Sequence, residues 1–270
     1  MTFGMSSENL VDDEIFMQEA FRIIEIAEER DITLRLLGSI AFRIHCPNYA
    51  PLLHQGAAVH RPLTDIDYMA YNTHKTPIRK LMYDLRFREI FADPIVSRIV
   101  FQSPKYKNLK VDFFLERLRF CHIIDFDRKK KRLEIDKPTI PLEEMLLEKM
   151  QIVEINEKDI TDTIMLVCEH DIEDDAEKNT EIIDGGFIAR ILADDWGFWY
   201  TVTTNLNKTK AWVPKYSNVL SEQDQSFAID RINELLERID LEEKTKRWQK
   251  RAKTGTKKRW YEEVQSFDVD

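Results

Sequence analysis

Glycine and cysteine are both scarce in this sequence. Only 7 of the 270 residues are glycine, which disfavours glycine-rich repeats and favours a high helix content, because glycine is a poor helix former. The three cysteines, Cys46, Cys121 and Cys168, are too few and too dispersed for a disulfide framework. We therefore expect a helix-rich cytoplasmic protein without disulfide bonds.

The sequence also lacks a long hydrophobic run. No window approaches 18 consecutive apolar residues, and the first residues do not combine a basic start with an apolar core. We therefore expect neither a membrane-spanning helix nor a signal peptide. Hydrophobic residues still make up 43% of the chain, which is enough for a core. The formal net charge of −9 argues against indiscriminate nucleic-acid binding but leaves room for a local basic patch.

Hydrophobic periodicity predicts a mixed α/β first half and a mainly helical second half. The predicted helices cover residues 8–29, 76–92, 141–170, 182–213 and 222–243, and the predicted strands cover residues 32–39, 64–71, 97–103 and 109–116. The aromatic residues at 196–200 are expected in the core. The segment 244–260 has nine basic residues, no acidic residue and two tryptophans.

Acidic residues in two apolar strands are the strongest chemical signal. Asp65 and Asp67 lie two residues apart in a strand, so both carboxylates point to one face, and Asp112 lies between Val111 and Phe113 in another strand. Buried carboxylates repel one another, and a divalent cation with oxygen ligands, such as Mg²⁺, removes that cost. Gly38-Ser39 lies at a strand-to-helix junction, where Ser39 is suited to cap the helix and backbone amides can bind phosphate. Together these features predict a Mg²⁺–polyphosphate site.

The segments LLGSIAF, LTDIDYMAY and KVDFFLE resemble the catalytic core of the nucleotidyltransferase (DNA polymerase β-like) superfamily. The segment LEKMQIVEINEKDITD is similar to a signature of nucleotidyltransferases that act as toxins of abortive-infection systems. Its matching residues are Lys149, Lys158, Asp159 and Asp162. The chain departs from these patterns in its long gap between Ser39 and Asp65, and in lacking the arginine that the toxin signature carries after its first lysine.

The resemblance implies an α+β fold, in which a nucleotidyltransferase-like mixed β-sheet is flanked by helices and followed by a mainly helical C-terminal domain. The change in sequence pattern at Pro138 and the basic run from residue 244 divide the chain into a catalytic domain over 1–137, a helical domain over 138–243 that completes the cleft, and a basic tail over 244–270. The implied reaction transfers a nucleoside monophosphate from an NTP to a hydroxyl of RNA, protein or a small molecule and releases pyrophosphate. A toxin-type enzyme with an antitoxin or another protein partner is one form of this function.

The same resemblance implies a role for each candidate residue. Asp65 and Asp67 would bind the Mg²⁺ that holds the triphosphate, and Asp112 would help bind a second Mg²⁺, with Mn²⁺ as an alternative metal. Phosphate contacts are implied for Gly38, Ser39, Lys149 and Lys158, and a supporting role is implied for Asp159 and Asp162.

Several of these features also have an ordinary structural explanation. Lys149 suits a solvated helix face as well as a phosphate site, and Lys158-Asp159 suits a local surface pair. The basic tail suits a solvated terminus as well as RNA binding, in which Trp248 and Trp260 would stack on bases or ribose. A catalytically inactive module that binds nucleotide or nucleic acid is the alternative to an enzyme.

Overall fold

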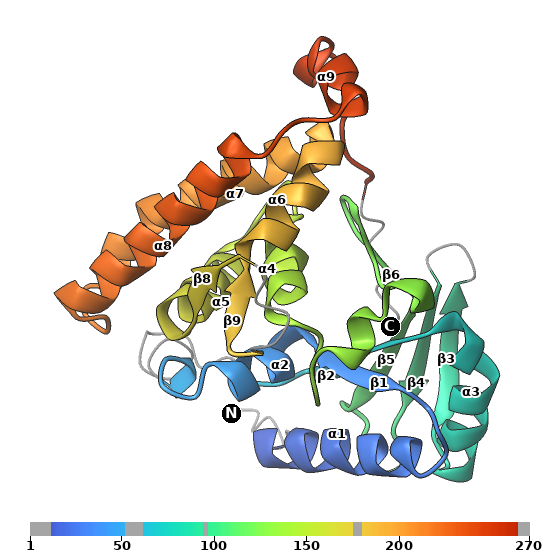
Figure 1. Cartoon of the computed structure of the whole chain (residues 1–270). Helices are drawn as coiled ribbons and strands as arrows, with labels where there is room; N and C mark the ends of the chain where they lie inside the picture. Colours follow the sequence, from blue (N-terminus) through green and yellow to red (C-terminus); the bar gives the residue numbers. More distant parts are fainter. Residues whose placement is uncertain (1–11, 52–61, 94–96, 175–179, 264–270) are drawn as a thin grey trace, which may run out of the picture.

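A five-stranded sheet and a group of helices beside it form the described part of the computed structural model (Figure 1). The structure describes residues 12–51, 62–93, 97–174 and 180–263. Along the chain the elements are α1 (Asp13–Glu28), β1 (Leu34–Leu37), α2 (Gly38–His45), β2 (Asp65–Ala70), α3 (Lys75–Asp84), β3 (Arg88–Asp93), β4 (Arg98–Gln102), β5 (Lys110–Leu115), β6 (Arg117–Arg119), β7 (Ile123–Asp125), α4 (Leu142–Met150), α5 (Glu157–Glu169), β8 (Asp171–Glu173), β9 (Ile182–Asp184), α6 (Gly185–Asp194), α7 (Trp196–Trp212), α8 (Glu222–Leu241) and α9 (Lys246–Ala252).

The main sheet is mixed, with the strand order β1-β2-β5-β4-β3. β2 and β5 are parallel, whereas the other neighbouring strands are antiparallel. The parallel register places Asp67 opposite Asp112, and the antiparallel register of β1 places Leu37 opposite Asp67. This mixed sheet with flanking helices, followed by a mainly helical second half, confirms the α+β architecture that the sequence predicts.

One face of the sheet is apolar and packs against α1. Alternate residues of β2 and β5 bury their side chains there, so that the ring of Tyr68 stacks on that of Phe113 with centroids 5.3 Å apart. The Tyr68 hydroxyl donates a hydrogen bond to the Ala20 carbonyl oxygen of α1 over 2.7 Å. Each large apolar side chain buried here contributes roughly 1.5–3 kcal/mol. Because side chains alternate between faces, the aspartates of β2 and β5 lie on the opposite face.

The linker after residue 137 brings the helical half to the end of β1. The Leu36 amide donates to the Pro138 carbonyl oxygen, and the Ile140 amide donates to the Leu36 carbonyl oxygen, each over 2.9 Å. This linker leads directly into α4, all nine residues of which are buried. α4 packs against α2, α5 and α7, and α7 and α8 pack side by side. None of the helices that the structure describes is long and apolar enough to cross a bilayer.

The structure corrects three boundaries in the sequence prediction. The helix predicted over 76–92 ends at Asp84, because Arg86 adopts a left-handed backbone conformation (φ 68°), and residues 88–93 then pair with β4 as an edge strand. The helix predicted over 141–170 is two helices, since Asn156 caps a new one by accepting from the Asp159 amide. Residues 182–184, predicted as helix, form β9.

Candidate active site

Three carboxylates converge on the face of β2 and β5 that is opposite α1. Asp65 and Asp67 share one face of β2, and the parallel register brings Asp112 of β5 beside them. One carboxylate oxygen from each of the three residues lies within 4.8 Å of the others. The sequence prediction that these aspartates lie on neighbouring strands therefore agrees with the geometry.

The electrostatics of this group favour a bound cation. Burial, together with the nearby charges of Asp65, Asp112 and Glu148, raises the pKa of Asp67 well above the usual aspartate value. Three carboxylates supply the hard oxygen ligands that Mg²⁺ takes in proteins. A divalent cation would offset their repulsion, so the donor set and its charge fit such an ion.

Arg98 is a site residue that the sequence analysis missed. Its guanidinium donates two hydrogen bonds to the Asp112 carboxylate, over 3.1 and 2.8 Å, and it lies over the ring of Phe114 at 5.5 Å. Burial still raises the pKa of Asp112 above the usual value, although Arg98 opposes that shift. Arg98 thus supplies a positive charge at one side of the triad. The available sequence signal was a charged residue in the apolar run SRIVFQS.

Gly38 closes the other side of the triad. Its backbone is left-handed (φ 66°), and a Cβ atom there would lie 2.5 Å from the Asp67 carboxylate oxygen Oδ2. The position therefore requires glycine on two grounds, conformation and space. α2 begins at Gly38 itself, with Leu37 as its N-cap, so the expected capping role of Ser39 is wrong. Ser39 lies half-buried in the first turn of α2.

A buried glutamate accepts a hydrogen bond from the backbone amide of Gly38. The Gly38 N–H donates to the Glu148 carboxylate over 3.3 Å. Burial raises the pKa of Glu148, and the adjacent Lys149 ammonium counters that shift. Glu148 was also missed by the sequence analysis, because its place in α4 resembles an ordinary charged helix position. The amide expected to bind phosphate is thus held by an internal anion.

Lys149 lies in a cluster of carboxylates between α4 and α5. Its ammonium nitrogen is 3.3 Å from Glu148, 3.3 Å from Asp162 and 3.6 Å from Asp159. It is buried and lies 5.1 Å from the centre of the Phe42 ring. The structure therefore brings Lys149, Asp159 and Asp162 together, whereas Lys158 is exposed in the first turn of α5. Lys149 is therefore not on a solvated helix face, which was the ordinary structural explanation for it.

A second group of potential metal ligands has a different character. His45, His170 and Glu181 lie close together. The two ring nitrogens of His170 lie 2.9 and 2.8 Å from the carbonyl oxygens of Glu181 and His45. A carbonyl oxygen only accepts, so a ring N–H of His170 is committed to one of these backbone oxygens, and the ring links the ends of α2 and α5 to the segment before β9. This leaves the aspartate triad as the better cation site.

Comparisons with known proteins find chains of similar structure, among them an antibiotic-resistance factor and a lincosamide antibiotic adenylyltransferase. No protein-family model matches the chain, and no curated protein matches it. The antibiotic-resistance factor ANT(2'')-Ia superposes with a TM-score of 0.39 and 12% identity, over 57% of this chain and 83% of that chain. The lincosamide antibiotic adenylyltransferase LnuA, solved with lincomycin bound, superposes with a TM-score of 0.37 and 18% identity, over 54% of this chain and 92% of that chain. The chemistry proposed for this chain therefore rests on the geometry of its own residues.

Proposed function

We propose that this chain is a Mg²⁺-dependent nucleotidyltransferase that moves a nucleoside monophosphate from an NTP to a hydroxyl acceptor. The observation that carries the proposal is the convergence of Asp65, Asp67 and Asp112 within 4.8 Å beside the left-handed Gly38. Retaining three mutually repelling carboxylates is costly unless they bind cations. Such a group is suited to bind a metal–triphosphate complex.

The proposed reaction forms a bond between the acceptor oxygen and the α-phosphorus and breaks the bond from that phosphorus to the β-phosphate. Pyrophosphate leaves, and the hydroxyl proton passes to a carboxylate, for which Asp112 is our candidate because burial raises its pKa. Asp65, Asp67 and Asp112 would hold two Mg²⁺ ions, or Mn²⁺, which when bound offset phosphate charge and lower the pKa of the acceptor hydroxyl. Gly38 and Ser39 amides would contact the β- and γ-phosphates, and Lys149 and Lys158 would offset their charge.

The finer parts of the proposal rest on the motifs and composition alone. We propose a catalytic part over 1–137, a helical part over 138–243 that completes the cleft, and a basic segment over 244–270. A cytoplasmic toxin-type enzyme with an antitoxin or another protein partner is the form that the motif resemblance favours. A catalytically inactive nucleotide-binding module is the alternative, and it predicts nucleotide binding without transfer.

Two labelled substrates test the reaction. The protein is incubated with Mg²⁺, total RNA, cell extract and each NTP carrying ³²P at either the α or the γ position. We expect α label in a macromolecular or small-molecule product and γ label in pyrophosphate. The Asp65→Ala/Asp67→Ala variant is the control and should give neither product. Transfer of γ label to an acceptor would assign a kinase instead, and nucleotide binding without any transfer would favour the inactive module.

Glu148 provides a separate prediction about nucleotide affinity. The Glu148 carboxylate accepts the hydrogen bond of the Gly38 amide. A phosphate that binds this amide must therefore displace the carboxylate or bind beside it against electrostatic repulsion. Glu148→Gln removes the charge and keeps the shape, so we expect a nonhydrolysable NTP with Mg²⁺ to bind about five-fold more tightly, which corresponds to about 1 kcal/mol.

Isothermal titration calorimetry measures this affinity. Glu154→Gln is the matched control, since it makes the same change in charge at an exposed residue outside the site, and it should leave the dissociation constant unchanged. Weaker binding by Glu148→Gln would show that Glu148 helps to bind the cation and is not a placeholder for phosphate.

A further inference from the structure

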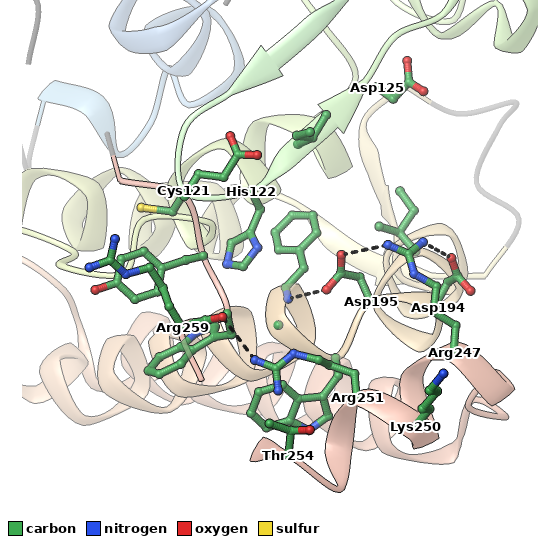
Figure 2. Close-up of a pocket in the computed structure, with 18 of the residues that line it drawn as sticks. Cys121, His122, Asp125, Asp194, Asp195, Arg247, Lys250, Arg251, Thr254 and Arg259 are labelled. Carbon is green, nitrogen blue, oxygen red and sulfur yellow. Dashed lines mark hydrogen bonds and ion pairs between the residues drawn. The ribbon is translucent and has the colours of Figure 1, made fainter. Parts of the chain in front are cut away.

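A large cavity lies between the β6–β7 hairpin and the C-terminal end of the helical half, and none of the three aspartates of the triad lines it. It has a volume of about 1170 Å³. Its walls come from the β6–β7 hairpin, the junction of α6 and α7, and the segment 244–263, as Figure 2 shows. The proposed nucleotide site uses none of these residues, so the cavity has no role so far.

The basic segment 244–260 is folded onto α7 by its two tryptophans. The Trp248 ring lies edge-on to Trp199, and the Trp260 ring lies edge-on to Tyr200, each with centroids 5.1 Å apart. The Trp260 indole N–H also donates to the Thr201 hydroxyl over 3.1 Å. These rings therefore hold the segment in place, whereas the sequence analysis considered them for stacking on bases.

The acidic residues of the cavity wall are already paired. Asp194 accepts from the Arg247 guanidinium over 3.0 Å, and Asp125 lies 3.3 Å from the Lys130 ammonium. Glu262, which also lines the cavity, pairs with Arg119 over 2.6 Å. Asp195 also lines the cavity and lies 3.7 Å from the same Arg247 guanidinium, so Asp194 and Asp195 share one cation.

An excess of positive charge remains after these pairs. Arg251 donates to the backbone carbonyl oxygens of Gly255 and Lys258 and lies 4.9 Å from the centre of the Trp196 ring, and it forms no ion pair with a carboxylate among residues 12–51, 62–93, 97–174 and 180–263. Lys250 lines the cavity and is exposed. Figure 2 shows both side chains on the wall formed by the C-terminal segment.

This positive charge continues along α9 beyond the cavity. Lys246 and Lys250 are exposed, are four residues apart, and lie on one face of the helix, and the exposed Lys253 follows three residues later. At 1.5 Å per residue, Lys246 and Lys253 are about 10 Å apart along the helix direction. This row of lysines is longer than a single phosphate group, so it is suited to contact successive phosphates along one nucleic-acid strand.

The cavity is connected to the triad through a short chain of contacts. Cys121 lines the cavity, and the preceding Phe120 packs edge-on against Phe114 of β5 with ring centroids 5.9 Å apart. Arg98, which lies over Phe114, holds Asp112. The cavity wall is therefore linked, through Cys121 and Phe120, to the strand that carries one of the three aspartates.

We propose that the cavity and the basic segment 244–260 bind the phosphodiester backbone of a single-stranded nucleic acid that is the acceptor. This inference rests on the proposed function, because it names the molecule whose hydroxyl receives the nucleotide. RNA and DNA strands share the backbone chemistry that the lysine row and the cavity recognise. Phosphate charge drives such binding and makes it depend strongly on salt.

Fluorescence anisotropy measures this binding without NTP. The probes are a fluorescein-labelled 16-nucleotide RNA and a DNA of the same sequence, titrated with the full chain at several KCl concentrations. The test variant is Lys246→Glu/Lys250→Glu. The matched control is Lys80→Glu/Lys107→Glu, which makes the same change in net charge at exposed lysines of α3 and of the β4–β5 turn.

We expect the test variant to bind at least tenfold more weakly, with a salt slope smaller by about 1.4, as the loss of two phosphate contacts to a single strand predicts. The control should bind like the wild type. Tight binding of one probe only would identify the source as RNA or as DNA. Equal affinity of test variant and control, or displacement of the probe by poly-glutamate at the same charge concentration, would overturn the inference.

This test separates the two proposals. Binding that depends on Lys246 and Lys250, without transfer of α label to any acceptor, would remove the proposed enzymatic function and leave the nucleic-acid surface. Transfer of α label to a small molecule or a protein by a chain that binds neither probe would remove the surface and leave the enzyme.

Discussion

Replacing Asp67 with asparagine is expected to lower the rate of nucleotide transfer by about 10³-fold, because several kcal/mol of metal-assisted charge stabilisation are lost and about 4 kcal/mol corresponds to that factor. Asp67 is the central carboxylate of the triad. It lies opposite Asp112 in the strand register and next to Gly38. Asparagine keeps the shape and removes the charge, so the fold should persist.

The same substitution has a signature in thermal stability. Mg²⁺ at about 100 times its dissociation constant adds roughly 2.7 kcal/mol to the folded state, which raises the melting temperature of a protein of this size by about 5–10 °C. We expect wild type to show this rise and Asp67→Asn to lack most of it. Without metal, the variant should melt above wild type, because one of three repelling carboxylates is gone.

Differential scanning fluorimetry with EDTA and with increasing MgCl₂ measures both effects. Asp240→Asn, at an exposed position near the end of α8, is the control for loss of one carboxylate and should respond to Mg²⁺ like the wild type. A normal Mg²⁺-dependent rise in Asp67→Asn would mean that the cation binds elsewhere, and full transfer activity in that variant would exclude the triad as the catalytic centre.

The local part of this site was predictable from the sequence. Side chains alternate along a strand, so Asp65 and Asp67 had to share a face once residues 64–71 were recognised as a strand. The apolar neighbours of Asp112 likewise indicated a buried strand position. The parallel pairing that brings Asp112 beside Asp67 depends on packing between distant segments, and here the motif resemblance supplied what periodicity could not.

Non-local contacts account for what the sequence analysis missed. Arg98 acts on Asp112 through an antiparallel pairing, and Glu148 reaches Gly38 across 110 positions of the chain. Neither contact has a local signature in its own segment. The basic segment shows the same limit, because its composition indicated a charged surface but not that Trp248 and Trp260 would be used to fold it onto α7.

Gly38→Ala should have the second large effect, through geometry and without a change of charge. A non-glycine residue in the left-handed region costs roughly 1–2 kcal/mol. The added methyl group would also lie 2.5 Å from the Asp67 Oδ2 atom, a distance that Cβ atoms do not tolerate. Either the Asp67 carboxylate rotates out of the triad or the start of α2 shifts. A misplacement of about 1 Å at a reacting centre can lower the rate by about 10²-fold, and we expect a loss of at least that size.

Gly255→Ala separates the clash from the backbone strain. Gly255 is also left-handed (φ 55°), but a Cβ atom there would meet nothing within 4 Å. Both variants should lose similar stability from strain, whereas only Gly38→Ala should lose the Mg²⁺-dependent rise in melting temperature. Equal Mg²⁺ responses in the two variants would mean that Asp67 is free to move without loss of the cation site. If only Gly38→Ala loses the Mg²⁺ response, glycine is required at position 38 to keep the Asp67 carboxylate in place. Backbone strain could not explain that result, because both variants have it and only Gly38 has a carboxylate next to it.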